Sequence, residues 1–270
     1  MSSQDLESIA RSLVASGKGI LAADESSGTI EKRFKAINVV STEESRRAYR
    51  EMLFTTPKLG QYISGVILYD ETIRQKAADG TPFTEVLKRQ GIVPGIKVDK
   101  GAKSMAGCPG EEVTEGLDGL RARLEEYFKM GARFSKWRAV ITIGSHIPTD
   151  ACLLANAHAL ARYAALCQEN GLVPIIEPEV LMDGNHTIEQ CEAVTSRTLQ
   201  IVFDMLIAQN IMLERMLLKP NMVIAAKDCP QQADMRQIAL ATVRCLRRYV
   251  PAAVPGIVFL SGGQNDVQAT

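Results

Sequence analysis

The chain repeats one pattern along its length, an apolar run of strand character followed by a helical segment. A repeat of about 30 residues is typical of βαβ units, which build parallel sheets. The length of 270 residues suits one domain, since (β/α) barrels commonly occupy about 250 residues. The sequence therefore predicts a single α/β domain over residues 1–270, with strands at 19–23, 64–69, 95–99, 133–144, 173–179, 216–223 and 256–260.

Two parallel architectures fit this pattern, a closed barrel and an open, doubly wound sheet. In a barrel the carboxyl ends of the strands converge on one mouth, whereas in a doubly wound sheet they lie along an edge. Charged or polar residues stand at or near six of the predicted strand ends, and a barrel would bring them together. This distribution favours a (β/α)8 barrel of the TIM type, with seven of the eight strands identifiable. The residues concerned are Asp24, Lys97, Lys136, Glu177, Lys219 and Ser261.

Several helix boundaries are also marked. Ser41 and Glu44 have the spacing of a capping box, which predicts a helix start. A long helix is expected between Thr149 and Asn170, where Gly171 follows as a stop signal. Two more helices are expected at about 187–210 and about 231–249.

Composition excludes several classes of protein. Lysine plus arginine and aspartate plus glutamate number 31 each, so net charge predicts neither a nucleic-acid nor a membrane surface. The first ten residues lack the pattern of a signal peptide, and apolar runs fall short of the ~20 residues that span a bilayer. We therefore expect a cytoplasmic protein. Six scattered cysteines and three separated histidines predict free thiols and no metal site.

Lys219 stands at the end of a predicted strand that is apolar on both faces, and directly before Pro220. Proline cannot donate to a sheet ladder, so the strand should stop there. Burial disfavours the ammonium form of a lysine and makes its amine a candidate nucleophile that forms an imine. A lysine that extends from a strand end into solvent is the alternative for this residue taken alone.

Two neighbouring predicted strands carry opposite charges at matching spacing. Lys136 and Arg138 share one face of the fourth strand, and Glu177 and Glu179 share one face of the fifth, by the two-residue period of a strand. Buried charges need partners, so we expect the two pairs to meet. The arrangement suits either a structural ion network or a catalytic site that moves protons beside Lys219.

The segment Ser261-Gly262-Gly263 follows the seventh predicted strand. Its backbone N–H groups suit a phosphate cradle, and barrels often hold phosphate at this position. An ordinary strand-to-helix turn is the alternative.

Six ordered motifs resemble the class I fructose-bisphosphate aldolase family over nearly the whole chain. They are Gly-Ile-Leu-Ala-Ala-Asp-Glu-Ser at 19–26, Gly-Ile-Lys-Val-Asp-Lys-Gly at 95–101, Lys-Trp-Arg at 136–138, Pro-Ile-Ile-Glu-Pro-Glu at 174–179, Leu-Leu-Lys-Pro-Asn at 217–221 and Phe-Leu-Ser-Gly-Gly-Gln at 259–264.

The resemblance implies cleavage of fructose 1,6-bisphosphate through a lysine Schiff base, without a cofactor or a metal, in a cytoplasmic homotetramer. Lys219 would form the Schiff base, Glu177 would accept and donate protons, Asp24 would act at the C–C cleavage step and Lys136 would assist it. Ser261, Gly262 and Gly263 would hold one phosphate and Arg33 the other. Lys97, Arg138 and Glu179, which lie in the matching motifs, are expected to bind substrate.

The chain departs from the family pattern in two places. Glu214-Arg215 stands where the family usually has Glu-Gly. The family also continues beyond the position of residue 270 into an eighth strand and a tail, so the sequence predicts a barrel that is shorter at its C-terminal end. Two alternatives stay open: another lysine-dependent sugar-phosphate aldolase, and a catalytically impaired form with a binding or scaffold role.

Overall fold

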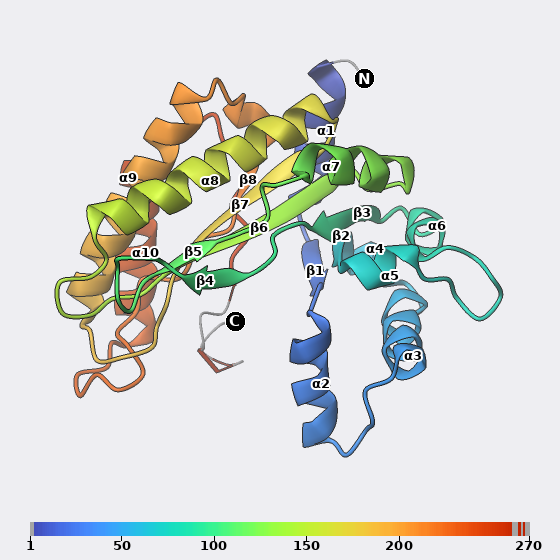
Figure 1. Ribbon diagram of the computed structural model, residues 1–270, viewed down its shortest axis with the longest axis horizontal. Helices are drawn as coiled ribbons and strands as arrows, with labels where there is room; N and C mark the ends of the chain where they lie inside the picture. Colours follow the sequence, from blue (N-terminus) through green and yellow to red (C-terminus); the bar gives the residue numbers. More distant parts are fainter. Residues whose placement is uncertain (1–2, 261–263, 266, 268–270) are drawn as a thin grey trace.

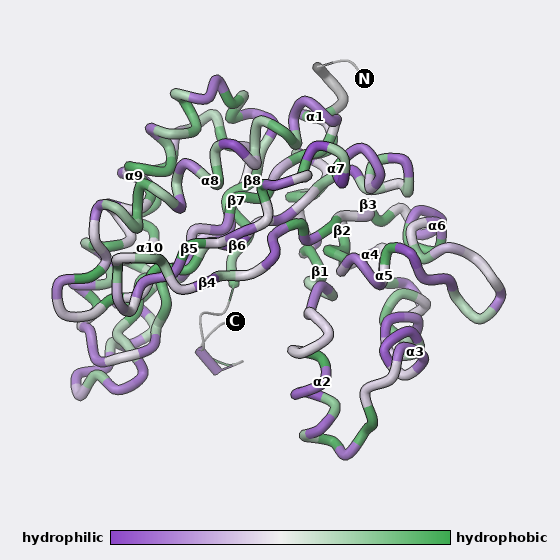
Figure 2. Tube along the Cα trace, viewed as in Figure 1, coloured by the Kyte–Doolittle hydropathy of each residue, from purple (hydrophilic) through white to green (hydrophobic). Residues whose placement is uncertain are grey.

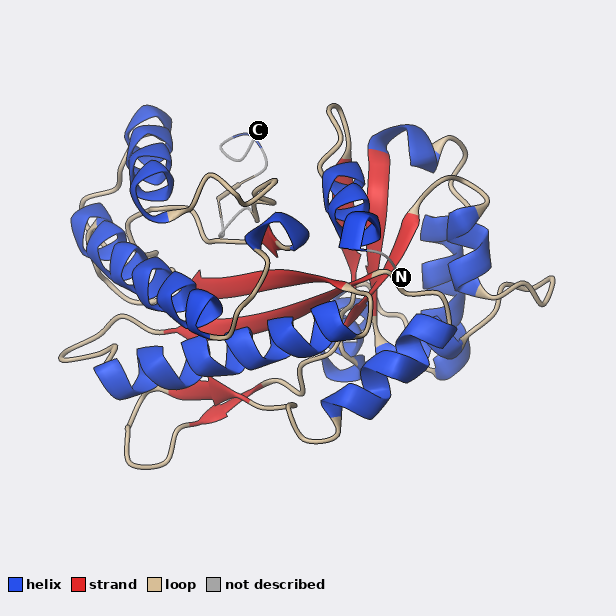
Figure 3. Cartoon of the chain, turned by 90° about the horizontal axis from the view of Figure 1, so that it is seen from above, coloured by secondary structure: helices blue, strands red, loops and turns tan. Residues whose placement is uncertain are grey.

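A parallel sheet of six strands organises the computed structural model, which describes residues 3–260, 264–265 and 267. The strand order is β1-β2-β3-β6-β7-β8, and every adjacent pair is parallel. The order follows the chain without a reversal, as in a barrel and unlike a doubly wound sheet. Figure 3 shows that the sheet curls, so that the two long strands run in a different direction from the others. The strands are β1 Gly19–Ala23, β2 Ile63–Leu68, β3 Val93–Lys97, β6 Phe134–Ile141, β7 Val173–Val180 and β8 Leu217–Leu218.

Helices cover the outside of this sheet (Figure 1). The three helices that follow β6, β7 and β8 lie together on one side, and the shorter helices lie beside β1 to β3. The helices are α1 Ser3–Leu13, α2 Ser27–Ala36, α3 Glu43–Phe54, α4 Leu59–Tyr62, α5 Asp70–Arg74, α6 Phe83–Lys88, α7 Leu120–Lys129, α8 Asp150–Glu169, α9 Ile188–Ala208 and α10 Met235–Tyr249, with a 3-10 turn at Leu213–Arg215.

Three predicted strands are shorter than expected. The fourth, expected at 133–144, spans Phe134–Ile141. The sixth, expected at 216–223, is confined to Leu217–Leu218, because Pro220 offers no N–H and the chain leaves the sheet there. The seventh, expected at 256–260, is a single parallel bridge from Leu218 to Ile257. A short antiparallel hairpin, β4 Ala102–Ser104 with β5 Glu112–Thr114, was not predicted.

Helix starts follow the sequence with two corrections. The helix expected at about 231–249 begins at Met235. The helix predicted to begin with a Ser41 and Glu44 capping box instead uses the next register, because Thr42 Oγ1 accepts from the Ser45 N–H at 3.0 Å. Ser45 Oγ in return accepts from the Thr42 N–H at 2.9 Å. Helices α8 and α9 begin after Thr149 and Thr187, whose side chains accept from the third helical residue.

The two largest clusters of buried apolar residues lie on opposite sides of the sheet. The larger one lies between the sheet and its helices, where Trp137 packs beside Tyr163 with ring centroids 5.5 Å apart. The smaller one lies inside the curl, where α1 covers Phe134 and Ile175. A Cβ added at Gly95 would lie 2.3 Å from the Phe134 ring, so glycine is required for this close approach.

Hydropathy differs between buried strands and exposed helices (Figure 2). The tube is mostly hydrophobic along β2 and mostly hydrophilic along α3. No helix in the described part of the chain is long and apolar enough to cross a membrane.

Candidate active site

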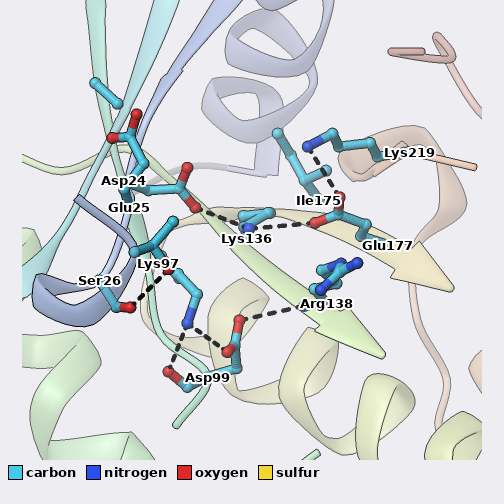
Figure 4. A network of polar contacts seen from close by, with 12 residues as sticks. Asp24, Glu25, Ser26, Lys97, Asp99, Lys136, Arg138, Ile175, Glu177 and Lys219 are labelled. Atoms are coloured by element: carbon cyan, nitrogen blue, oxygen red, sulfur yellow. Dashed lines mark hydrogen bonds and ion pairs between the residues drawn. The ribbon is translucent and has the colours of Figure 1, made fainter. Parts of the chain in front are cut away.

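Four predicted site residues form a continuous chain of ion pairs (Figure 4), in which Lys136 and Glu177 lie within β6 and β7, and Asp24 and Lys219 directly follow β1 and β8. Lys136 Nζ lies 2.8 Å from Asp24 Oδ2 and 3.3 Å from Glu177 Oε2. Lys219 Nζ lies 2.9 Å from Glu177 Oε1. Glu177 therefore faces one lysine with each carboxylate oxygen, and the chain runs from Asp24 to Lys219.

Sheet register produces this arrangement. Arg138 is the direct partner of Glu177 across the parallel pair of β6 and β7, and Lys136 is the partner of Ile175. Residues two apart on a strand share a face. Lys136 therefore reaches diagonally to Glu177, and Arg138 reaches diagonally to Glu179, with which it forms an ion pair. The predicted pairing of the two charge sets is confirmed.

The ion-pair chain is largely withdrawn from water. The exposed fractions of the side chains are 3% for Glu177, 6% for Lys136, 11% for Asp24 and 15% for Lys219. Interactions between charges strengthen when water is excluded. The site can therefore fix the ionisation states of its members through their neighbours.

Opposite charges control the pKa values of the Asp24 and Lys136 pair. Burial alone would raise the pKa of Asp24, but the charge and hydrogen bond of Lys136, together with the charges of Lys219 and Lys97, hold that pKa below its usual value. Burial alone would lower the pKa of Lys136, but the carboxylates of Asp24, Glu177 and Asp99 raise it. Both members are charged at neutral pH as a result.

The cationic site residue on β3 has a partner that was not predicted. Lys97 pairs with Asp99, and its ammonium also donates to the Asp99 carbonyl at 3.2 Å. The other Asp99 carboxylate oxygen accepts from the Arg138 N–H at 3.3 Å. The spacing of two between Lys97 and Asp99 is the signal by which the sequence identified the other charge pairs, so Asp99 was accessible to the same reasoning.

Two cavities meet this chain of charges. One of about 510 Å³ is lined by Asp24, Lys97, Lys136, Arg138 and Arg33, together with Ser26 and Thr29. The other, of about 480 Å³, lies between β1 and residues 257–260 and is largely apolar, with Lys219 in its wall. Glu177 links the two, because it pairs with Lys136 in the wall of the first cavity and with Lys219 in the wall of the second.

Arg33 lies farther out than the other predicted residues. Its side chain is 61% exposed and pairs with the carboxylate of Glu25. The predicted phosphate cradle at Ser261, Gly262 and Gly263 falls outside the described residues. In the part of the chain that is described, no group of three histidine, cysteine, aspartate or glutamate side chains is placed to hold a metal ion.

Comparison with known proteins identifies the family. Residues 5–270 match the family model described as fructose-bisphosphate aldolase class-I. This chain belongs to the class I fructose-bisphosphate aldolase family. The sequence resemblance is thereby confirmed.

Individual aldolases match over nearly the whole chain. A probable class 1 fructose-bisphosphate aldolase of Xanthomonas campestris is 62% identical over 270 residues, which are 100% of this chain and 81% of that protein. Cytosolic fructose-bisphosphate aldolase 5 of Arabidopsis thaliana is 55% identical over 98% of this chain and 74% of its own length.

A solved aldolase structure confirms the barrel-type fold. Fructose-bisphosphate aldolase of Plasmodium falciparum, in a ternary complex with TRAP and a small-molecule inhibitor, superposes with a TM-score of 0.96. The two sequences are 50% identical, and the match covers 98% of this chain and 77% of the Plasmodium chain. The curled six-stranded sheet is therefore part of an aldolase-type TIM barrel.

Proposed function

We propose that this chain reversibly cleaves fructose 1,6-bisphosphate into dihydroxyacetone phosphate and glyceraldehyde 3-phosphate. The observation that carries the proposal is the ion-pair chain from Asp24 through Lys136 and Glu177 to Lys219, in a chain of the aldolase family. It places an amine, a proton carrier and a second carboxylate along one buried path, as imine chemistry requires.

In the proposed mechanism the Lys219 amine attacks the C2 carbonyl of the substrate. Glu177, 2.9 Å from Lys219 Nζ, takes up and returns the protons that accompany loss of water to give the protonated imine. Asp24, assisted by the Lys136 ammonium, accepts the proton of the C4 hydroxyl. The C3–C4 bonding electrons then move toward the iminium nitrogen, the aldehyde leaves, and an enamine remains on Lys219.

The remaining predicted residues are proposed to hold the substrate. Lys97, Arg138 and Arg33 supply positive charge to the polar cavity, and the carboxylate of Glu179 orients Arg138. Ser261, Gly262 and Gly263 are proposed to hold the second phosphate on the basis of the resemblance alone.

Three broader features are also proposed. Residues 1–270 form one aldolase-type barrel domain, as the family match over 5–270 supports. A cytoplasmic location is supported by the relatives named cytosolic. A homotetramer rests on the family resemblance, and a molar-mass measurement against the 29.5 kDa chain tests it.

Trapping of the imine tests the mechanism. Borohydride added with dihydroxyacetone phosphate should reduce the adduct to a stable secondary amine, and peptide mass analysis should place it on Lys219. Lys219→Ala should abolish the adduct, and turnover of fructose 1,6-bisphosphate by the unaltered protein should persist in EDTA.

Other outcomes contradict the proposal in different ways. An adduct on Lys97 or Lys136 would identify a different nucleophile. Loss of turnover in EDTA with rescue by zinc would replace the imine with metal chemistry. Turnover of fructose 1-phosphate equal to that of the bisphosphate would indicate an enzyme that needs only one phosphate contact.

A further inference from the structure

A buried arginine on α3 contacts the chain on both sides of Asp24. Arg50 Nε donates to the Ala23 carbonyl at 2.8 Å. Its Nη2 donates to the Glu25 carbonyl at 3.3 Å and lies 2.9 Å from Glu25 Oε2. A single guanidinium therefore holds the residue before Asp24 and the residue after it.

Asp24 needs such support because it lies just beyond its strand. The ladder between β1 and β2 ends at the pair Ala23 and Leu68. The Asp24 carboxylate is held at 2.8 Å by Lys136 from β6, but that contact fixes only the side chain. The planar guanidinium of Arg50 has the shape to fix the backbone, because its donors lie in a rigid fork.

The burial of the Arg50 guanidinium carries a desolvation cost, which points to a role other than packing. Its side chain is 3% exposed, and burial lowers the pKa of its guanidinium. Within the described residues its Nη1 atom has no hydrogen-bond partner. Its carboxylate partner Glu25 also pairs with the exposed Arg33. A buried cation that shares its counter-ion with a second cation is not explained by a gain in folding stability.

We propose that Arg50 is a positioning residue that holds Asp24 in place for cleavage of the C3–C4 bond. The inference rests on the function proposed above. Arg50 should affect C3–C4 cleavage and not imine formation. It contacts the residues beside Asp24 and, among the described residues, has no contact with Lys219 or Glu177. Loss of Arg50 should therefore impair cleavage and spare imine formation.

The test compares both steps in Arg50→Lys, which keeps the charge but loses the fork. Turnover of fructose 1,6-bisphosphate should fall about 10²-fold, the effect of a misplacement of about 1 Å at a reacting group. The rate of borohydride trapping with dihydroxyacetone phosphate should stay within about twofold of the unaltered protein. Arg47→Met is the matched control, since Arg47 lies on the same helix and pairs with Glu44 and Glu51 instead.

A double variant identifies the residue through which Arg50 acts. If Arg50 works by placing Asp24, Arg50→Lys added to Asp24→Asn should cost less than about threefold in turnover, because coupled residues are not additive. Glu25→Gln weakens the contact between Arg50 and Glu25 from the other side. It should also lower turnover and leave trapping unaltered, so it serves as the test if Arg50→Lys does not fold.

The possible failures are distinguishable. Parallel loss of trapping and turnover in folded variants, unaltered turnover, or full additivity with Asp24→Asn would overturn the role of Arg50 and leave the aldolase function standing. Absence of trapping and turnover in the unaltered protein would overturn the proposed function itself.

Discussion

Glu177 occupies the centre of the site because its two oxygens face two different lysines. Its side chain is 3% exposed, and its neighbours are Lys219 at 2.9 Å and Lys136 at 3.3 Å. A carboxylate in that position can exchange protons with the nucleophile while Lys136 balances its charge. The structure thus separates the proton carrier, Glu177, from Asp24, which contacts Lys136 from the opposite side and lines the polar cavity.

Replacement of this carboxylate by an amide should expose its role. Glu177→Gln preserves the size of the side chain but removes the proton carrier, so imine formation should slow by about 10²- to 10⁴-fold. The rate of borohydride trapping measures this effect. Glu192→Gln is the control, because Glu192 pairs with Arg244 between α9 and α10, and trapping there should be unaltered. A Glu177→Gln protein that traps at the normal rate would assign the proton transfer to another group.

Single residues were predictable where a strand period constrained them. Lys136, Arg138, Glu177 and Glu179 share faces of adjacent strands, and their pairing followed from that period. Arg50 was not predictable, because an arginine in a helix normally faces water and its buried position depends on where α3 packs.

At the scale of elements, caps fix the helices that cover the strands carrying the site. Helix α10 begins with a capping box, in which Asp234 Oδ1 accepts from the Gln237 N–H at 2.8 Å and Gln237 Oε1 accepts from the Asp234 N–H at 2.9 Å. Its buried face includes Cys245 and Leu246. A loss of the cap should therefore loosen a packed helix without touching the ion-pair chain.

The cost of losing this cap can be measured by urea unfolding. Asp234→Ala should lower the free energy of unfolding by about 1 kcal/mol, and Asp234→Asn by much less, since asparagine also accepts from the backbone. Asp228→Ala in the preceding loop is the control and should change stability by less than about 0.5 kcal/mol. Equal effects of the alanine and asparagine variants would show that the hydrogen bond is not the cause.

Elements were predictable where local signals determine them. The starts of α8 and α9 follow from Thr149 and Thr187. The Ser41 capping box was placed one residue early because the run of serine, threonine and glutamate at 41–45 permits two registers, and the helix uses the second. The length of the Lys219 strand was overestimated, since apolarity beyond Pro220 reflects burial in a loop: Val223 and Ala226 are buried without being in a strand.

At the scale of the whole molecule, the barrel type followed from charges that a flat sheet would separate. The structure brings Asp24 of the first strand end to Lys136 of β6, across the curl of the sheet. The β4–β5 hairpin was not predicted, because two three-residue strands carry little periodic signal. Helix α1 was missed although Leu6, Ala10 and Leu13 recur on one face at helical spacing and are buried. The same arrangement buries Lys136 between the carboxylates of Asp24 and Glu177, so we expect the stability of the whole molecule to depend on this cation.

Lys136→Met should make that dependence visible as a function of pH. At pH 7 the variant leaves the carboxylates of Asp24 and Glu177 buried without their shared cation, and removal of one partner of a buried pair costs about 3–5 kcal/mol. In the unaltered protein Lys136 lowers the pKa of Asp24. The stability that Asp24 gains from this pair is present above its pKa in the unfolded chain, about 3.9, and is lost as pH falls through its lower pKa in the folded protein.

The variant should respond to acid in the opposite direction at this site. Without Lys136, burial is the largest influence left on Asp24 and raises its pKa, so protonation relieves the buried charge instead of breaking a pair. The difference in unfolding free energy between the two proteins should therefore shrink as pH falls from 7 to about 4, in urea titrations at each pH. Lys227→Met is the control, because Lys227 pairs with Asp183 at an exposed site, and its small effect should not vary in this range. A difference for Lys136→Met that stays constant or grows toward pH 4 would mean that the Asp24 and Lys136 pair does not contribute to stability as its burial indicates.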